Sequence, residues 1–200
     1  MKAIEKNLRL FAFAGGLFFL LFSTFNAQDL PKEIRGYKVY RAKISVKTEG
    51  EKAGAKDESE AFVRVGEPEL IDVSLAGITF ELSAEIDSIK ESGTIDFLTF
   101  QDFRVNGLKV SVEEYRESIE LKKNQPIALP KPVKIFLSAG ETLRGAIKET
   151  KDSKDQWTVT GRIFVFGQFK KSFLKFKRVI PVDINIKIKN PIKQSIESAA

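Results

Sequence analysis

The sequence predicts an all-β, mainly antiparallel fold, a sandwich or a barrel, with one short helix. Two observations carry this prediction. Short runs of alternating apolar and polar residues recur along most of the chain, and Gly, Pro and Asn separate them. No long helical repeat stands between these runs, as a parallel α/β sheet would require. The pattern is therefore typical of antiparallel sheets that pack around one core.

The N-terminal residues 1–27 have the three parts of a secretory signal peptide. Basic residues precede an apolar run from Leu10 to Phe22, and Ala27 is a small residue at the expected cleavage point. Residues 10–28 contain no charge, so the segment is also long enough for a membrane anchor. We expect export to the periplasm, the outer envelope or the exterior, with attachment to the membrane if the segment is retained.

Residues 28–60 are expected to form a lead-in strand and a flexible charged loop. Residues 37–46 alternate between apolar and mostly basic side chains, which indicates a strand with one break in its phase. Residues 48–60 contain no large apolar residue, a composition typical of a flexible loop or linker.

A β-sandwich domain is expected over residues 61–190, with a C-terminal tail at 191–200. Its first long apolar alternation spans residues 69–86 and changes phase at Ala76-Gly77. Asn106-Gly107 lies between two further alternating runs, which predicts a tight β-hairpin.

One segment has the periodicity of a helix. Residues 140–151 place Leu143 and Ile147 four positions apart among charged side chains, so a short helix is expected there. Strand-like alternation returns at Trp157, which we interpret as an aromatic residue of the core or its rim.

In the last segment, apolar residues occupy even positions from Ile180 to Ile188, and mostly polar residues occupy odd ones. The even side chains are therefore expected to point into the core and the odd ones into water. Arg178 and Val179 interrupt this alternation just before Pro181, so we expect a bulge or a bend there.

The lysines of this segment and of the turn before it have two interpretations. The simpler one is a solvated sheet face that also discourages edge-to-edge pairing. The alternative is a basic patch for phospholipid head groups or another acidic surface, provided that the fold gathers the lysines on one side. The candidate contact residues are Lys170, Lys171, Lys175, Lys177, Lys187 and Lys189.

Histidine and cysteine are both absent, which excludes several kinds of chemistry. Histidine-based acid–base catalysis, thiol nucleophiles, disulfides, Cys/His zinc sites and acylation of a cysteine all require these residues. The net charge of +6 is modest and, in an exported protein, argues against nucleic acid as a partner.

No pattern of catalytic residues stands out. Asp72, Glu81, Glu85 and Asp87 are the acids expected on regular strands, but no cluster of sugar-binding aromatics accompanies them. The sequence has no nucleophile elbow, P-loop, dinucleotide motif or EF-hand spacing. We therefore expect no enzyme, no cofactor and no metal site.

The order of these segments resembles the type 2 late-embryogenesis-abundant family, including its water-stress and hypersensitive-response relatives. The resemblance covers approximately residues 67–186. VSLAGITFELSAEI is similar to the family's opening strand pair, FQDFRVNGLKVSV to its next hairpin, and VTGRIFVF with VIPVDINIKI to its late strands. The family usually has an Asn-Pro soon after its first long strand, but the Asn-Pro of this chain is Asn190-Pro191, near the C-terminus. This departure suggests a divergent, bacterial-type member with a signal peptide.

The resemblance implies an immunoglobulin-like or fibronectin-III-like β-sandwich without a catalytic site. The leading expectation is a non-catalytic exported protein with a stress-protective or macromolecule-binding role at the cell envelope, whose partner is a protein or an anionic membrane or envelope surface. The alternative is a module that binds lipid or an anionic envelope polymer through the lysine faces and an apolar pocket. A hydrolase with a Ser–Lys or a two-carboxylate site is the third hypothesis.

Overall fold

The protein is described here by a computed structural model. The described residues are 30–48, 61–87, 89, 91–143, 155–171 and 173–190. The chain divides into the compact units Met1–Pro31 and Lys32–Ala200, and every described strand belongs to the second unit. The expected signal peptide or anchor, the charged loop from residue 49 and the C-terminal tail lie outside the described residues. Among those that are described, no helix is long and apolar enough to cross a membrane.

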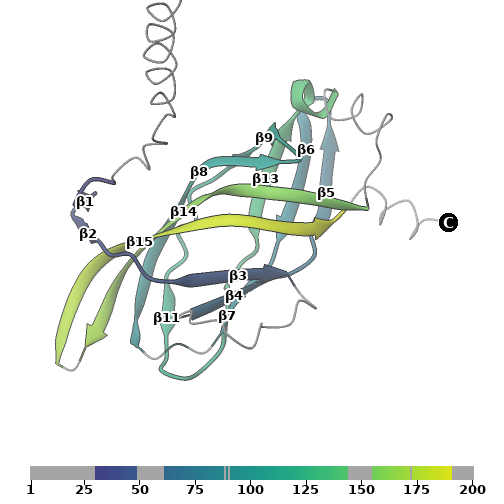
Figure 1. Cartoon of the computed structure of the whole chain (residues 1–200). Helices are drawn as coiled ribbons and strands as arrows, with labels where there is room; N and C mark the ends of the chain where they lie inside the picture. Colours follow the sequence, from purple (N-terminus) through teal and green to yellow (C-terminus); the bar gives the residue numbers. More distant parts are fainter. Residues whose placement is uncertain are drawn as a thin grey trace, which may run out of the picture. The chain divides into compact units, whose positions relative to one another are not determined.

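Three β-sheets build the unit Lys32–Ala200, which confirms an all-β, mainly antiparallel and sandwich-like fold (Figure 1). The strands are β1 (Glu33–Ile34), β2 (Tyr37–Val39), β3 (Ile44–Thr48), β4 (Ala61–Val65), β5 (Glu69–Ser74), β6 (Gly77–Leu82), β7 (Ala84–Ile86), β8 (Ser92–Val105), β9 (Leu108–Lys109), β10 (Ser111–Val112), β11 (Ile119–Leu121), β12 (Ile127–Ala128), β13 (Val133–Ser138), β14 (Gln156–Lys171) and β15 (Leu174–Lys189). A short helix begins at residue 139 and is described as far as residue 143, and the rest of the expected helix lies outside the described residues.

The largest sheet has seven strands in the order β1-β2-β15-β14-β8-β11, with β9 paired to β8. Two four-stranded sheets have the orders β10-β13-β6-β5 and β12-β7-β4-β3. Most pairs are antiparallel, but β15 pairs with β2, and β3 with β4, in parallel. The segment expected as a single lead-in strand thus supplies β1, β2 and β3, which join strands much later in the chain.

The β14–β15 ladder is the longest element among the residues that the structure describes. Each strand has 16 residues, and the pairing runs without a register shift from Gln156↔Lys189 to Lys171↔Leu174. One half of the ladder lies over the smaller sheets, and the other half projects beyond them as an arm (Figure 1). In the first half, the even residues from Ile180 to Ile188 are buried and the prediction of an inward even face is confirmed. Trp157 is also buried, edge-to-face against Phe80.

The bulge expected before Pro181 is not found in the β14–β15 ladder. The β14–β15 pairing passes through Pro181 without a shift, and the irregularity lies instead between β14 and β8, at Phe166/Gly167. The N–H of Tyr40 donates to the carbonyl of Val179 at 2.9 Å, so the backbone polar groups of Val179 point toward β2. Those of Pro181, two residues on, point to the same side, where the pairing with β2 has ended. The missing N–H of proline therefore removes no ladder bond.

The hairpin predicted at Asn106-Gly107 is confirmed. Both residues have positive φ angles, 51° and 81°, and Arg104↔Lys109 and Val105↔Leu108 pair on either side of them. These angles are those of the tight two-residue turn that matches the twist of antiparallel strands.

The run 69–86 forms a hairpin and a third short strand rather than one strand with a change of phase. The chain turns between β5 and β6 and pairs them, with a register shift between Leu70 and Asp72. Ile71, Val73 and Leu75, the alternating apolar residues at the start of this run, are exposed. All six residues of β5, the edge strand of its sheet, are exposed, so neither face of this strand is covered.

Candidate functional site

An apolar cavity of about 450 Å³ lies where the three sheets meet. Its walls come from the large sheet (Ile95, Leu98, Phe103, Val159, Ile163, Val165, Phe169, Ile180, Val182, Ile184, Ile186), from the β3–β4–β7 sheet (Ile44, Val46, Val63, Val65, Ala84, Ile86) and from the third sheet (Leu82, Val112, Val133, Ile135). Pockets of this size and character hold small apolar ligands in many proteins.

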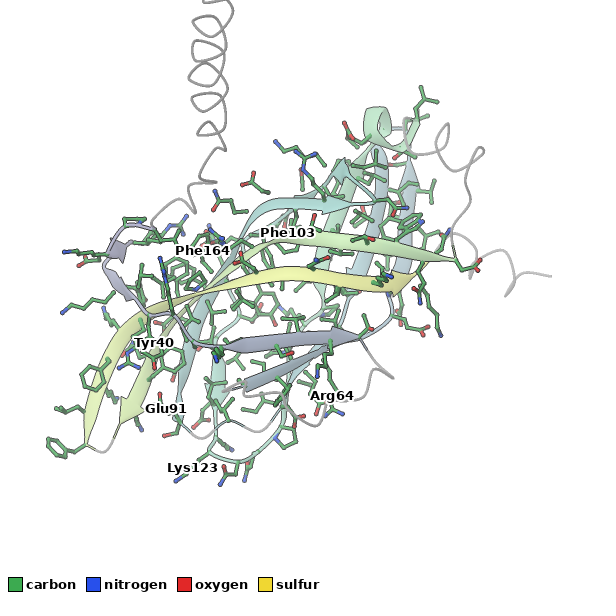
Figure 2. The ribbon with its side chains drawn as sticks, viewed as in Figure 1. Tyr40, Arg64, Glu91, Phe103, Lys123 and Phe164 are labelled. Carbon is green, nitrogen blue, oxygen red and sulfur yellow. The ribbon has the colours of Figure 1, made fainter. Side chains whose placement is uncertain are left out.

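The β3–β4 side of the cavity explains why the space is not filled. A sheet strand that packs well alternates between buried and exposed residues, but all five residues of β3 are half-buried. Ala61 and Ala84 put short side chains on this wall. On the opposite wall, Gly161 has no Cβ, which would lie 2.6 Å from the Phe103 ring, so that ring can lie against β14 (Figure 2).

The cavity has one polar end. Among the described residues that line it, Glu91 and Arg178 are the charged ones, and Tyr40 lies with them. The Arg178 guanidinium lies 4.3 Å from the centre of the Tyr40 ring and 5.2 Å from that of Phe176. Figure 2 places Tyr40 and Glu91 near the base of the β14–β15 arm. Two aromatic rings thus hold a cation at the rim of an apolar space.

The other face of the large sheet carries a second apolar cluster, which we call the outer aromatic cluster: Tyr37, Phe97, Phe166 and Val179. Phe97 and Phe166 stack with ring centres 4.4 Å apart, and Tyr37 meets Phe166 edge-to-face at 5.3 Å. The Tyr37 hydroxyl donates to the Asp96 carboxylate at 2.8 Å. Burial, followed by the hydrogen bond and the charge of Asp96, raises the pKa of the Tyr37 phenol.

The β1–β2 hairpin closes this cluster. Arg35 lies over the rings of Phe97 and Phe166 and donates to Glu114 at 2.9 Å. Val179 therefore becomes fully buried although it occupies an odd position of β15. The alternation of β15 is interrupted at Arg178 and Val179 because its outer face changes there. The β1–β2 hairpin covers this face at Val179, and solvent covers it further along the strand.

The structure separates the candidate lysines into two groups. Lys170 and Lys175 are direct partners across the β14–β15 ladder, and Lys177 lies two residues further on the same face. Lys187 and Lys189 lie about 40 Å away along β15, given the rise of a strand. Lys189 forms an ion pair with Glu67. The side chain of Lys171 lies outside the described residues, and contact of these lysines with an anionic surface stays a prediction.

Two lysines that sequence reasoning missed join the group on the arm. Lys122 and Lys123, at the end of β11, line one polar hollow together with Lys170 and Lys175. Asp96 and Glu120 are the acids of this hollow. The pairing of β11 with β8 brings these residues to the arm, and nothing in the local sequence indicates that contact.

The acids considered for catalysis are surface residues. Arg64 contacts both Glu85, at 3.2 Å, and Asp87, at 3.9 Å, and Lys134 lies 3.9 Å from Glu81. Asp72 is exposed on β5. Across the described ranges, no three or more acids gather in a way that could hold a metal ion.

No protein-family model and no curated protein sequence matches the chain. Two solved structures are similar at a distance. A crystal structure of a protein from Archaeoglobus fulgidus has 9% identity and a TM-score of 0.36, over 64% of this chain and 94% of that one. A solution structure described as that of a candidate late embryogenesis abundant protein has 13% identity and a TM-score of 0.31, over 64% of this chain and 70% of that one. No family model confirms the family resemblance.

Proposed function

We propose that this chain is a non-catalytic, exported binding protein of the cell envelope that holds an amphiphile, an acyl chain with an acidic head group, in the cavity between its sheets. The apolar cavity of about 450 Å³ is the observation that carries the proposal. The N-terminal sequence supports export, and the absence of histidine and cysteine supports a role without catalysis.

An occupant is favoured because protein interiors are normally packed as densely as organic crystals. Side chains that face open space instead of one another give up packing contacts, and that loss costs stability. An acyl chain in the cavity would restore the contacts that the facing side chains do not make with one another.

An acidic head group is favoured by the polar end of the cavity. Arg178 contacts two aromatic rings, and the described residues provide no carboxylate within ion-pair distance of it. A guanidinium at the rim can donate two parallel hydrogen bonds to a carboxylate or a phosphate. Glu91 at the same end disfavours a second negative charge, so a head group with one charge fits best.

The test is titration of the unit Lys32–Ala200 with a fluorescent fatty acid such as cis-parinaric acid. Ala84→Phe places a ring in the cavity, and its matched control is Ala128→Phe, because Ala128 is exposed on the adjacent strand β12. We expect saturable binding to the wild type and to Ala128→Phe, and at least tenfold weaker binding to Ala84→Phe. Arg178→Gln should weaken binding of the acid but not of the corresponding alcohol.

Equal binding to the wild type and to Ala84→Phe would contradict a site in the cavity. Equal effects of Arg178→Gln on the acid and the alcohol would contradict the role given to the guanidinium. Folding of each variant is checked by circular dichroism, because a ring in a close-packed core would cost about 1–3 kcal/mol.

A further inference from the structure

We propose that the tip of the β14–β15 arm is a docking site for an anionic lipid bilayer. Phe173 and Leu174 lie where the two strands join, and their exposed fractions are 88% and 50%. Large apolar side chains at the end of a projecting element cannot be buried by the fold itself (Figure 1). The two side chains are adjacent, and a contiguous exposed apolar patch is typical of a surface that meets an apolar phase or a partner.

Lysines surround the base of this tip. Lys170 and Lys175 face one another directly behind it, and Lys122 and Lys123 line the same hollow. The two acids of the hollow, Asp96 and Glu120, only partly offset the charges of its four lysines.

The order of apolar and basic residues along the arm matches the profile of a membrane surface. Phe173 and Leu174 come first and would enter the boundary of the acyl chains. The lysine ammonium groups would follow at the level of the phosphates. A soluble polyanion would use the lysines but would leave the two apolar side chains in water, so a bilayer is the better partner.

The edge strand β5 is the competing surface. Val73 on this strand and Leu75 in the turn that follows it are strongly exposed, Leu75 completely. Acids accompany them, because Glu69 and Asp72 lie on the same strand and are exposed. An anionic bilayer would be repelled by these carboxylates, so β5 lacks the charge complementarity that the arm has.

Docking through the arm would also bring the cavity close to the bilayer. Phe169 lines the cavity and is followed directly by Lys170, and Arg178 lies four residues after Leu174. The polar end of the cavity therefore lies at the base of the docking arm. The docking proposal itself rests on the exposed tip and its lysines, and it holds whether or not the cavity binds an acyl chain.

The experiment is co-sedimentation of the unit Lys32–Ala200, which contains every described strand and buried residue, with phosphatidylglycerol and with phosphatidylcholine vesicles. We expect binding to phosphatidylglycerol only, weakening as salt rises from low to physiological concentration. Phe173→Ser combined with Leu174→Ser should weaken binding at least about tenfold. Lys170→Glu combined with Lys175→Glu should weaken it by a similar or larger factor.

Two matched controls lie elsewhere on the chain. Leu75→Ser removes an exposed apolar side chain from the turn after β5. Lys187→Glu combined with Lys134→Glu changes the net charge equally at other exposed lysines. Both should leave binding within about twofold of the wild type if docking is local to the arm. In a second measurement, Phe173→Trp should be quenched by brominated phosphatidylglycerol, and Leu75→Trp should not.

Several results would overturn docking through the arm. They are equal binding to both lipids, an equal loss from Leu75→Ser, and a Phe173→Trp emission that brominated lipid leaves unchanged. Loss with the glutamate variants but not with the serine variants, together with binding to soluble polyphosphate, would show that the surface takes an anionic polymer instead. Cavity binding is measured separately with cis-parinaric acid in vesicle-free solution, so failure of one proposal is distinguishable from failure of the other.

Discussion

The two faces of the large sheet are packed in opposite ways. On the outer face, Phe166 and Val179 are almost completely buried, and the Phe97 and Phe166 rings stack at 4.4 Å. On the inner face, buried side chains of the same strands line a cavity of about 450 Å³. The outer cluster is small and covered by the local β1–β2 hairpin, whereas the inner face depends on two separate sheets for its cover.

This difference assigns stability and binding to different faces. A close-packed aromatic cluster gains dispersion contacts on all sides and resists any change of volume. The side chains of a cavity wall lack part of those contacts. The wall therefore tolerates changes of side-chain volume and can gain contacts from a bound ligand. The comparison predicts that equal substitutions on the two faces will have unequal effects.

Phe166→Ala should be the most destabilising change on either face. It removes a ring that contacts Tyr37 and Phe97, and we expect the free energy of unfolding to fall by about 3–5 kcal/mol. Chemical denaturation measures this loss, and Phe173→Ala on the exposed tip is the control, with a change within about 0.5 kcal/mol. A loss below 1 kcal/mol for Phe166→Ala would mean that the outer cluster does not hold the fold together.

A bound fatty acid should stabilise the wild type strongly and a cavity-filled variant hardly at all. Ligand at about one hundred times its dissociation constant raises the free energy of unfolding by about 2.7 kcal/mol. Ala84→Phe should lose this gain, whereas Phe173→Ala should keep it, because the tip does not line the cavity. Thermal denaturation with and without ligand makes the comparison, and an equal gain in all three proteins would place the ligand outside the cavity.

A matched pair of valines compares the two faces with identical chemistry. Val179→Ala in the outer cluster should cost about 1–2 kcal/mol, because it opens a hole in close-packed surroundings. Val63→Ala on the cavity wall should cost less than about 1 kcal/mol, since part of its side chain already faces open space. The denaturant midpoints of the two variants report this difference in the free energy of unfolding, provided that the denaturant dependence m is unchanged. Equal losses of stability would mean that the cavity is packed in solution.

The smallest expected effect is a loss of folding stability at alkaline pH, where the Tyr37 phenol ionises. Burial and Asp96 raise the pKa of this phenol above its ordinary value of 10.0, so folding favours the neutral form. The resulting stability is present below pH 10 and is lost as the pH rises through the folded-state pKa. Tyr37→Phe should remove this alkaline loss, and Asp96→Asn should lower the pKa measured by ultraviolet titration. An unchanged titration in Asp96→Asn would contradict the hydrogen bond between the two residues.

The sequence predicted correctly those elements whose conformation depends on residues close together in the chain. The Asn106-Gly107 turn and the buried even residues of β15 follow from backbone preference and period-two alternation, and both are confirmed. The burial of Val179 on the outer face could not be predicted, because the β1–β2 hairpin that covers it lies some 140 residues earlier in the chain. Pro181 was misinterpreted for the same reason, since only the extent of pairing with β2 shows that its missing N–H is harmless.

Only part of the candidate site could be predicted from the sequence. The lysine rows were visible in the sequence, but their division into a group on the arm and a group about 40 Å away follows from the length and register of the ladder. Lys122 and Lys123 join the first group through a strand pairing. The cavity has no sequence pattern of its own, because its walls have the same alternating apolar residues as a filled core.

Native mass spectrometry of the unit Lys32–Ala200 tests the central claim, that the cavity holds an acyl amphiphile, most directly. The protein is purified without detergent from bacterial cells and measured before and after organic extraction. One non-covalent acidic lipid per chain, lost on extraction, regained on incubation with fatty acid and absent from Ala84→Phe, is the predicted result. A chain that carries no lipid before extraction and takes up none from fatty acids or phospholipids afterwards would contradict the account.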